Sequence, residues 1–186
     1  MYKNYINEIY KKKFGNDDNL ISLGWGSHES QEIRFEILLN IGYKNNDTVL
    51  DVGCGFGDIS TKINNYYGID IRENVIEIAK TKYKKKFNCK NIFEINEKFD
   101  WVISSGIFCF KLNWEKQTFS TIEKMWNLSK KGIAINFLSD LSDGKRDDDM
   151  KFTKLDEILP LVNKLTHKFI IRHDYLPNDF TIYLYK

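Results

Sequence analysis

Apolar residues recur along this chain in two alternating patterns. Some segments repeat them every three or four residues, which is the spacing of one helix face, whereas others are short unbroken runs typical of strands buried on both sides. The first pattern predicts helices at residues 2–14, about 30–40 and 73–86, one from Asn113 to Gly132, and one interrupted by Pro160, with Ser30 capping the second. The second predicts strands at residues 48–52, 66–71, 88–93, 99–104, 133–138, 168–175 and 180–185.

The order of these elements predicts the class of fold. Strands that alternate with helices form a mainly parallel sheet with right-handed crossovers, covered by helices on both faces. The last two strands are separated only by the turn at residues 176–179, so the final strand should run antiparallel. We therefore expect an α/β fold, a three-layer Rossmann-like sandwich, in a single domain over residues 1–186.

Composition narrows the functional classes. A chain of 186 residues with 42% hydrophobic residues suits one sizeable core. No stretch approaches about 18 uninterrupted apolar residues, and the first residues lack the apolar core of a signal peptide. The cysteines Cys54, Cys89 and Cys109 have no metal-ligand spacing, and their odd number argues against a disulfide framework. The sequence thus predicts a protein of the reducing cytoplasm, with no metal and no membrane partner.

Charge argues against nucleic acid as a partner. The formal net charge of +2 is well below that of a typical nucleic-acid binder. The one basic run, from Lys80 to Lys90, covers the end of a predicted helix, where lysines complement the helix dipole and stay solvated. We interpret this run as solvated surface, with a basic binding patch as the alternative.

The most informative segment is a glycine-rich turn at residues 51–58, Asp-Val-Gly-Cys-Gly-Phe-Gly-Asp, between a buried strand and a predicted helix. Glycines there let the backbone turn tightly and let a ligand lie against it. A dinucleotide-binding turn has its third glycine where this chain has Asp58, and a carboxylate at that point would repel a pyrophosphate. S-adenosylmethionine is cationic and has no phosphate, so the turn favours it. A turn that only connects strand to helix is the alternative.

Asp70 is the second candidate for ligand binding. It ends the second predicted strand, where a carboxylate can accept hydrogen bonds from both hydroxyls of a ribose. A surface carboxylate that caps the next helix is the alternative. Because Asp70 follows the glycine-rich turn by one strand, we favour the ribose role.

Taken together, residues 49–60, Gly68-Ile69-Asp70 and residues 99–106 resemble the class I S-adenosylmethionine-dependent methyltransferases. The resemblance covers nearly the whole chain. It implies a seven-stranded sheet with an antiparallel last strand, glycines behind the methionine part of the cofactor, Asp51 near its ammonium group and S-adenosylhomocysteine as product. The usual Asp beside the adenine is missing after the third strand, where Asn91 or Glu94 is the nearest candidate. The predicted cofactor-binding residues are Trp25, Arg34, Asp51, Gly53, Cys54, Gly55, Asp70, Ile71, Asn91, Ser104 and Ser105.

The segment at residues 24–35 also looks like that of small bacterial methyltransferases of this class. Arg34 could bind the cofactor's carboxylate with both guanidinium nitrogens, and Trp25 could pack over the methionine arm. The alternatives are an arginine paired with Glu29 or Glu36 and a tryptophan of the core. We expect residues 1–47 to form a helical lid over a core fold of residues 48–186.

The predicted reaction is methyl transfer to an oxygen or nitrogen atom of a small-molecule acceptor, such as a surface-glycan or nucleotide-linked precursor. A lid this short suits a small acceptor. If the acceptor must lose a proton, His28, His173 and Asp140 are the candidate bases, because they lie near the expected strand ends. Asn136 and Ser139 could face the acceptor. The alternatives are a nucleic-acid methyltransferase, a non-catalytic binding module with this fold, and a nicotinamide-dependent oxidoreductase.

Overall fold

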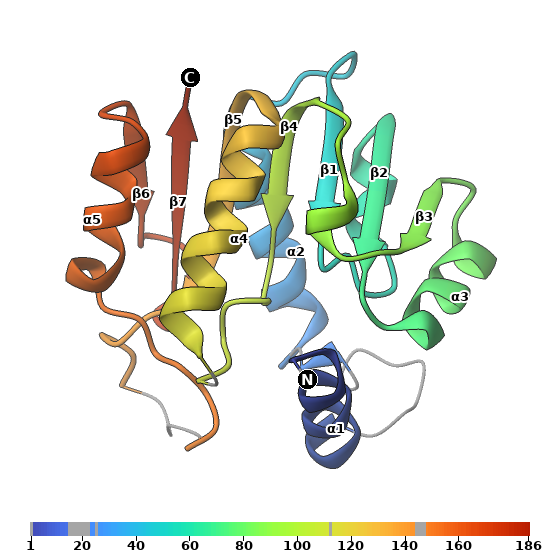
Figure 1. Ribbon diagram of the computed structural model, residues 1–186, viewed down its shortest axis with the longest axis horizontal. Helices are drawn as coiled ribbons and strands as arrows, with labels where there is room; N and C mark the ends of the chain where they lie inside the picture. The colour runs from blue at the N-terminus through green and yellow to red at the C-terminus, as the bar shows by residue number, and fades with distance from the viewer. Residues whose placement is uncertain (1, 15–22, 25, 112, 144–147) are drawn as a thin grey trace.

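The computed structural model describes residues 2–14, 23–24, 26–111, 113–143 and 148–186. They form a seven-stranded sheet in the order β3-β2-β1-β4-β5-β7-β6, parallel from β3 to β5, with β7 antiparallel to both of its neighbours (Figure 1). The elements in chain order are α1 (Tyr2–Phe14), α2 (His28–Leu39), β1 (Thr48–Val52), η2 (Asp58–Lys62), β2 (Asn65–Asp70), α3 (Glu73–Lys82), β3 (Lys86–Cys89), η3 (Ile92–Glu94), β4 (Phe99–Ser104), α4 (Trp114–Leu128), β5 (Ser129–Leu138), α5 (Leu155–Leu165), β6 (Phe169–Arg172) and β7 (Asp179–Tyr185).

Helices cover both faces of the sheet, which gives the expected three layers. In Figure 1, α4 and α5 lie in front of the sheet and α2 lies behind it. Neighbouring strand residues point to opposite faces, so the fully buried Leu50 packs in the α4–α5 core while Val49 packs in the α2–α3 core. The α/β class, the seven strands and the antiparallel last strand are therefore confirmed. The part of the chain described here has no helix long and apolar enough to span a membrane.

Several predicted boundaries were wrong. Gly132 does not end α4; it lies inside β5, where a Cβ atom would come within 2.2 Å of the Leu184 carbonyl oxygen on the paired strand. Helix α5 runs unbroken through Pro160. Helix α2 is capped by Ser27, whose side chain accepts a hydrogen bond from the Ser30 amide, so Ser30 is inside the helix.

The edge of the sheet at β3 also differs from the prediction. Helix α3 ends at Lys82 because the chain then returns to pair with β2, with Lys86 opposite Tyr67 and Cys89 opposite Asp70. The glycine-rich turn is followed by the five-residue 3-10 helix η2 rather than by an α-helix. A turn followed by so short a helix offers little dipole to a phosphate, which further weakens the dinucleotide alternative.

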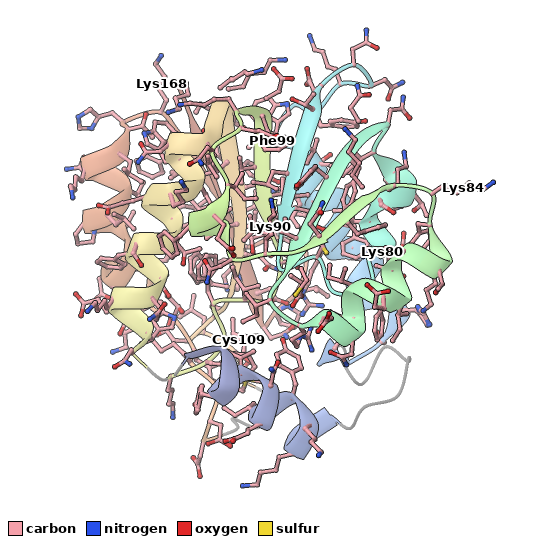
Figure 2. The ribbon with its side chains drawn as sticks, turned by 45° about the vertical axis from the view of Figure 1, so that its right-hand side comes forward. Lys80, Lys84, Lys90, Phe99, Cys109 and Lys168 are labelled. Carbon is pink, nitrogen blue, oxygen red and sulfur yellow. The ribbon has the colours of Figure 1, made fainter. Side chains whose placement is uncertain are left out.

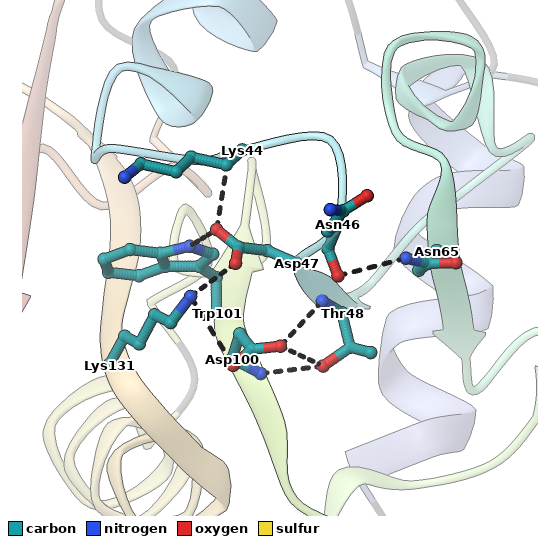
Figure 3. Close-up of polar contacts among 8 residues, drawn as sticks. All are labelled: Lys44, Asn46, Asp47, Thr48, Asn65, Asp100, Trp101 and Lys131. Atoms are coloured by element: carbon teal, nitrogen blue, oxygen red, sulfur yellow. Dashed lines mark hydrogen bonds and ion pairs between the residues drawn. The ribbon is translucent and has the colours of Figure 1, made fainter.

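A polar network fixes the amino ends of the central strands (Figure 3). The Asp47 carboxylate accepts hydrogen bonds from the Lys44 amide at 2.9 Å, from Trp101 Nε1 at 2.8 Å and from Lys131 Nζ. Burial acts to raise the pKa of Asp47, but the bonds from Lys131 and Trp101 outweigh it and the net pKa lies below the ordinary value. The network ties the chain before β1 to β4 and β5, and it lies opposite the ends where a ligand is expected.

Candidate active site

A cavity of about 280 Å³ lies at the carboxyl ends of the parallel strands. This is the edge where open α/β sheets bind their ligands. Its walls come from the carboxyl ends of β1, β2 and β5, from the residues that follow β1 to β4, and from α2 and α1, the latter lying beneath these strand ends in Figure 1. Segments far apart in the sequence therefore meet at one site.

The glycine-rich turn forms one wall of the cavity and is pinned to β2. The amides of Gly53 and Cys54 both donate to the Ile69 carbonyl oxygen, at 2.8 and 3.0 Å. Gly53 and Gly55 have φ values of +75° and +54°, the left-handed region that favours glycine. A Cβ atom on Gly53 would lie 2.1 Å from Ile107 Cγ2, so only glycine lets the loop after β4 approach this closely.

Asp51 lies buried at the end of β1 and faces the cavity. The Tyr66 hydroxyl donates a 2.7 Å hydrogen bond to Asp51 Oδ2. Burial, with a smaller contribution from the negative charge of Asp70, raises the pKa of Asp51 to about 7. A cation beside this carboxyl would lower its pKa again, and the ionised carboxylate would attract the cation. The position therefore suits an ammonium group.

Asp70 ends β2 and is fixed by three donors. Its Oδ2 accepts from the Gly55 amide at 3.2 Å, and its Oδ1 accepts from the Arg72 amide at 2.9 Å and from Arg72 Nε at 3.4 Å. The Arg72 guanidinium in turn lies 3.8 Å from the ring centre of Tyr10 on α1. The carboxylate is thereby oriented at the cavity, and α1 is joined to it through one arginine.

Arg34 reaches the cavity from α2, where it pairs with Asp179. Its Nη1 donates to the Ser30 carbonyl oxygen at 2.9 Å, and its Nη2 donates to Asp179 Oδ2. Leu138 on β5 is paired with Asp179 on β7, which places this carboxylate at the same edge of the sheet. Burial raises the pKa of Asp179, against the opposing charge of Arg34. Asp179 could not be predicted as this partner from the sequence, where Glu29 or Glu36 was the alternative to a cofactor carboxylate, and the cofactor role of Arg34 stays a prediction.

The loop after β4 separates the two predicted serines. Ser104 is fully buried and donates to the Val52 carbonyl oxygen at 2.8 Å, so it joins β4 to β1 and does not line the cavity. Ser105 does line it. The next amide, of Gly106, donates to Asn136 Oδ1 on β5 at 3.0 Å. The loop is therefore held in place by a side chain from the neighbouring strand.

The segments after β2 and β3 form the far side of the cavity, which is the expected adenine side. Ile71 and Asn91 both line it. The Asn91 side chain accepts from the Phe93 amide at 3.1 Å, while Glu94 is turned back to accept from the Asn91 amide at 2.7 Å. Of the two residues predicted for this position, Asn91 lines the cavity and Glu94 does not.

The predicted bases lie away from the described lining of the cavity. His28 is exposed at the start of α2, and His173 Nε2 lies 2.7 Å from Ser139 Oγ. Neither histidine lines the cavity, and nor does Asp140. Cys54 lines it within the glycine-rich turn, whereas Trp25 is outside the described residues. The roles predicted for these bases, for Cys54 and for Trp25 stay predictions.

Most of the basic run lies along the outer edge of the sheet, whereas Lys90 at its end lines the cavity. Lys80 pairs with Glu77, and Lys85 donates to the carbonyl oxygens of residues 63 and 64. In Figure 2, Lys84 extends away from the molecule beyond β3. These local contacts agree with the interpretation of the run as solvated surface.

A family model described as a methyltransferase domain matches residues 43–156, which is more than half of the chain. The chain belongs to this methyltransferase family. The match spans the glycine-rich turn, Asp70, the loop after β4 and Asn136, so it includes most of the cavity wall of this methyltransferase. Sterol 24-C-methyltransferase of Saccharomyces cerevisiae is 30% identical over 128 residues, which cover 65% of this chain and 31% of the yeast protein. The chain thus spans about a third of the length of that curated relative.

Solved methyltransferases share the fold at low sequence identity. Magnesium protoporphyrin IX methyltransferase of Synechocystis PCC 6803, solved with bound S-adenosylhomocysteine, gives a TM-score of 0.67 at 13% identity, covering 98% of this chain and 95% of that one. An S-adenosylmethionine-dependent methyltransferase from Clostridium acetobutylicum gives a TM-score of 0.63 at 13% identity, covering 99% of both chains. These likenesses establish the architecture of this methyltransferase.

Proposed function

We propose that this chain uses S-adenosylmethionine to methylate an oxygen or nitrogen atom of a small-molecule acceptor. One observation carries the proposal: two buried carboxylates, Asp51 and Asp70, flank a glycine-rich turn in a single cavity. A carboxyl facing an ammonium group and a carboxylate facing two ribose hydroxyls are what this cofactor requires. The surface-glycan or nucleotide-linked acceptor and the bacterial cytoplasmic setting remain predictions from the sequence.

The described residues fit the cofactor along the whole cavity. Asp70 would hold the ribose, Asp51 would lie beside the ammonium group, and Ile71 with Asn91 would border the adenine. Gly53 and Gly55 keep the turn in a left-handed conformation at the cavity wall, with Ile107 packed where a side chain of Gly53 would lie. The cofactor supplies an electrophilic methyl group on a sulfonium, and the protein's part is to orient the acceptor beside it and exclude water.

The position of Asp58 supports this choice over a dinucleotide. Its carboxylate lines the cavity, where Tyr83 and Gln31 hold it with hydrogen bonds of 2.7 and 3.3 Å. A fixed negative charge at the start of η2 opposes a pyrophosphate group there.

Asp70→Asn should weaken the binding of S-adenosylhomocysteine by about 10- to 100-fold, because losing hydrogen bonds to a charged group costs roughly 1.5–3 kcal/mol. The variant keeps the shape of the side chain but loses its charge. Isothermal titration calorimetry measures the effect, and Asp156→Asn on the exposed surface of α5 is the matched control. A normal affinity in a folded Asp70→Asn protein would remove Asp70 from the cofactor site.

We further propose that α1 acts as the lid predicted for residues 1–47, over the core fold of residues 48–186, whereas α2 of the same segment packs in the core behind the sheet. Helix α1 meets the cavity through two sets of contacts. Tyr10 lies on Arg72, and Ile6 and Ile9 pack against Phe110. Because Arg72 is bonded to Asp70, a ribose held by Asp70 should stabilise the docked helix.

Hydrogen exchange tests this lid. The amides of α1 should exchange about 10-fold or more slowly when S-adenosylhomocysteine is bound, since cofactor binding would disfavour the undocked helix. The amides of α5, which lies away from the cavity, provide the internal control. Strong protection of α1 without ligand, unaltered on its addition, would mean that the helix is a fixed part of the fold.

A further inference from the structure

One buried side chain in the cavity keeps a hydrogen-bond donor for a ligand. Asn136 is 3% exposed and lines the cavity at the end of β5. Its Oδ1 accepts from the Gly106 amide, which fixes the orientation of the side-chain amide and leaves Nδ2 as the other group. Among the described residues Nδ2 has no acceptor. The neighbouring Ser105 Oγ is also buried and without a described partner.

One wall beside this donor is apolar, while the Arg34–Asp179 pair and, from α4, Gln117 and Thr121 are the polar groups that also line the cavity. The thiol of Cys109 donates to the Gly106 carbonyl oxygen at 2.9 Å, which folds the loop after β4 back and brings Cys109 near Asn136. Beyond it, Phe110 packs edge-to-face on Tyr10 with ring centres 5.4 Å apart, and Ile6 and Met150 complete the cluster. Figure 2 shows Cys109 beside α1, so this wall lies between the strand ends and the helix.

These walls restrict what can bind there. The whole cavity, at about 280 Å³, is just below the range of about 300–1,000 Å³ usual for ligand sites, and the cofactor must share it. A sugar would press several hydroxyls against apolar side chains, and each unpaired hydroxyl lowers affinity by about 10-fold. An aromatic ring would instead pack against Tyr10 and Phe110.

We propose that this end of the cavity is the acceptor site and that it takes a small aromatic compound whose single hydroxyl accepts a hydrogen bond from Asn136 Nδ2. The inference rests on the proposed function and specifies its acceptor, in place of the surface-glycan or nucleotide-linked precursor predicted from the sequence. It also favours oxygen over nitrogen: a hydroxyl oxygen has two lone pairs, so one can accept from Asn136 while the other faces the methyl group. A neutral amine has one lone pair, and the bond from Asn136 would occupy it. Transfer would form the oxygen–methyl bond as the sulfur–methyl bond breaks, with S-adenosylhomocysteine as leaving group and the hydroxyl proton released to water.

The test uses the whole chain saturated with S-adenosylhomocysteine and follows binding by NMR titration. The probes are p-cresol, toluene as the same ring without the hydroxyl, and methyl α-D-glucopyranoside as the sugar. We expect p-cresol to bind at least about 10-fold more tightly than the glucoside and to shift the side-chain amide signal of Asn136. Asn136→Asp keeps an oxygen for the Gly106 amide but removes the donor. This variant should bind p-cresol about 10-fold more weakly than the wild type and should bind toluene with an affinity within about 2-fold of the wild type's.

Asn127→Asp, at the exposed end of α4, is the matched control and should leave all three probes unchanged. A first titration with S-adenosylhomocysteine alone decides the proposed function separately, and without cofactor binding both proposals fail. If the cofactor product binds, the acceptor inference is overturned by any of three results. The first is no p-cresol binding, and the second is a glucoside that binds as tightly as p-cresol. The third is p-cresol binding that leaves the Asn136 amide signal unshifted and is as tight in Asn136→Asp as in the wild type.

Discussion

Gly55→Val should lower the affinity for S-adenosylhomocysteine by at least about 100-fold while the sheet stays folded. Gly55 has a φ of +54°, and a Cβ atom there would lie 3.0 Å from Leu23 Cδ1 on the cavity side of the turn. Valine would therefore project two further carbons into the space where the cofactor meets the backbone, and a β-branched residue also disfavours this φ. The Gly55 amide is bonded to Asp70, so any shift of the turn would displace the ribose-binding carboxylate as well.

The control for this prediction is a glycine with similar backbone strain outside the site. Gly42 has a φ of +108°, and its added Cβ would meet only Trp101 Cζ2, at 3.8 Å. Gly42→Val should lose stability but bind S-adenosylhomocysteine normally once folded. Circular dichroism checks the fold of both variants and calorimetry their affinity. If a folded Gly55→Val protein binds the ligand as the wild type does, the turn is only a connector.

Elements whose boundaries are set by local chemistry could be predicted from the sequence. Strands β1 and β4 matched their predicted limits because each is a short, mainly apolar run followed at once by small residues, Gly53 after β1 and Ser105-Gly106 after β4. Gly132 was misread because a helix-ending glycine and a glycine under a neighbouring strand look alike in sequence. Only the pairing of β5 with β7 shows that the Leu184 backbone leaves no room for a side chain.

The same distinction holds for the site. The glycine-rich turn and Asp70 lie within one strand–turn–strand unit, so their meeting at the cavity follows from spacing alone. Arg34 and Asp179 are 145 residues apart, and no local pattern links them. Asn136 was noted as a residue facing the acceptor, but its remaining donor depends on the Gly106 amide having taken its oxygen. Contacts across the sheet edge require the three-dimensional fold.

Arg34→Met should destabilise the fold by about 3–5 kcal/mol at neutral pH, because it leaves a buried carboxylate without its cation. The side chains of Arg34 and Asp179 are only 10% and 3% exposed, so water cannot replace the missing partner. Denaturant unfolding followed by tryptophan fluorescence measures the change. Arg172→Met, which breaks the exposed pair with Asp174, is the matched control and should have little effect.

The pH dependence identifies the cause of this loss. Burial already holds the pKa of Asp179 above its ordinary value, and removing Arg34 takes away the charge that lowers it. A carboxyl with a raised folded-state pKa destabilises the fold when it is ionised and ceases to do so once it is protonated in both states. The deficit of Arg34→Met should therefore be largest near neutrality and shrink as the pH falls toward the unfolded-state pKa of about 3.9. Adding Asp179→Leu should recover most of the stability at neutral pH. A deficit that is the same at acidic and neutral pH would instead point to lost packing around the arginine stem.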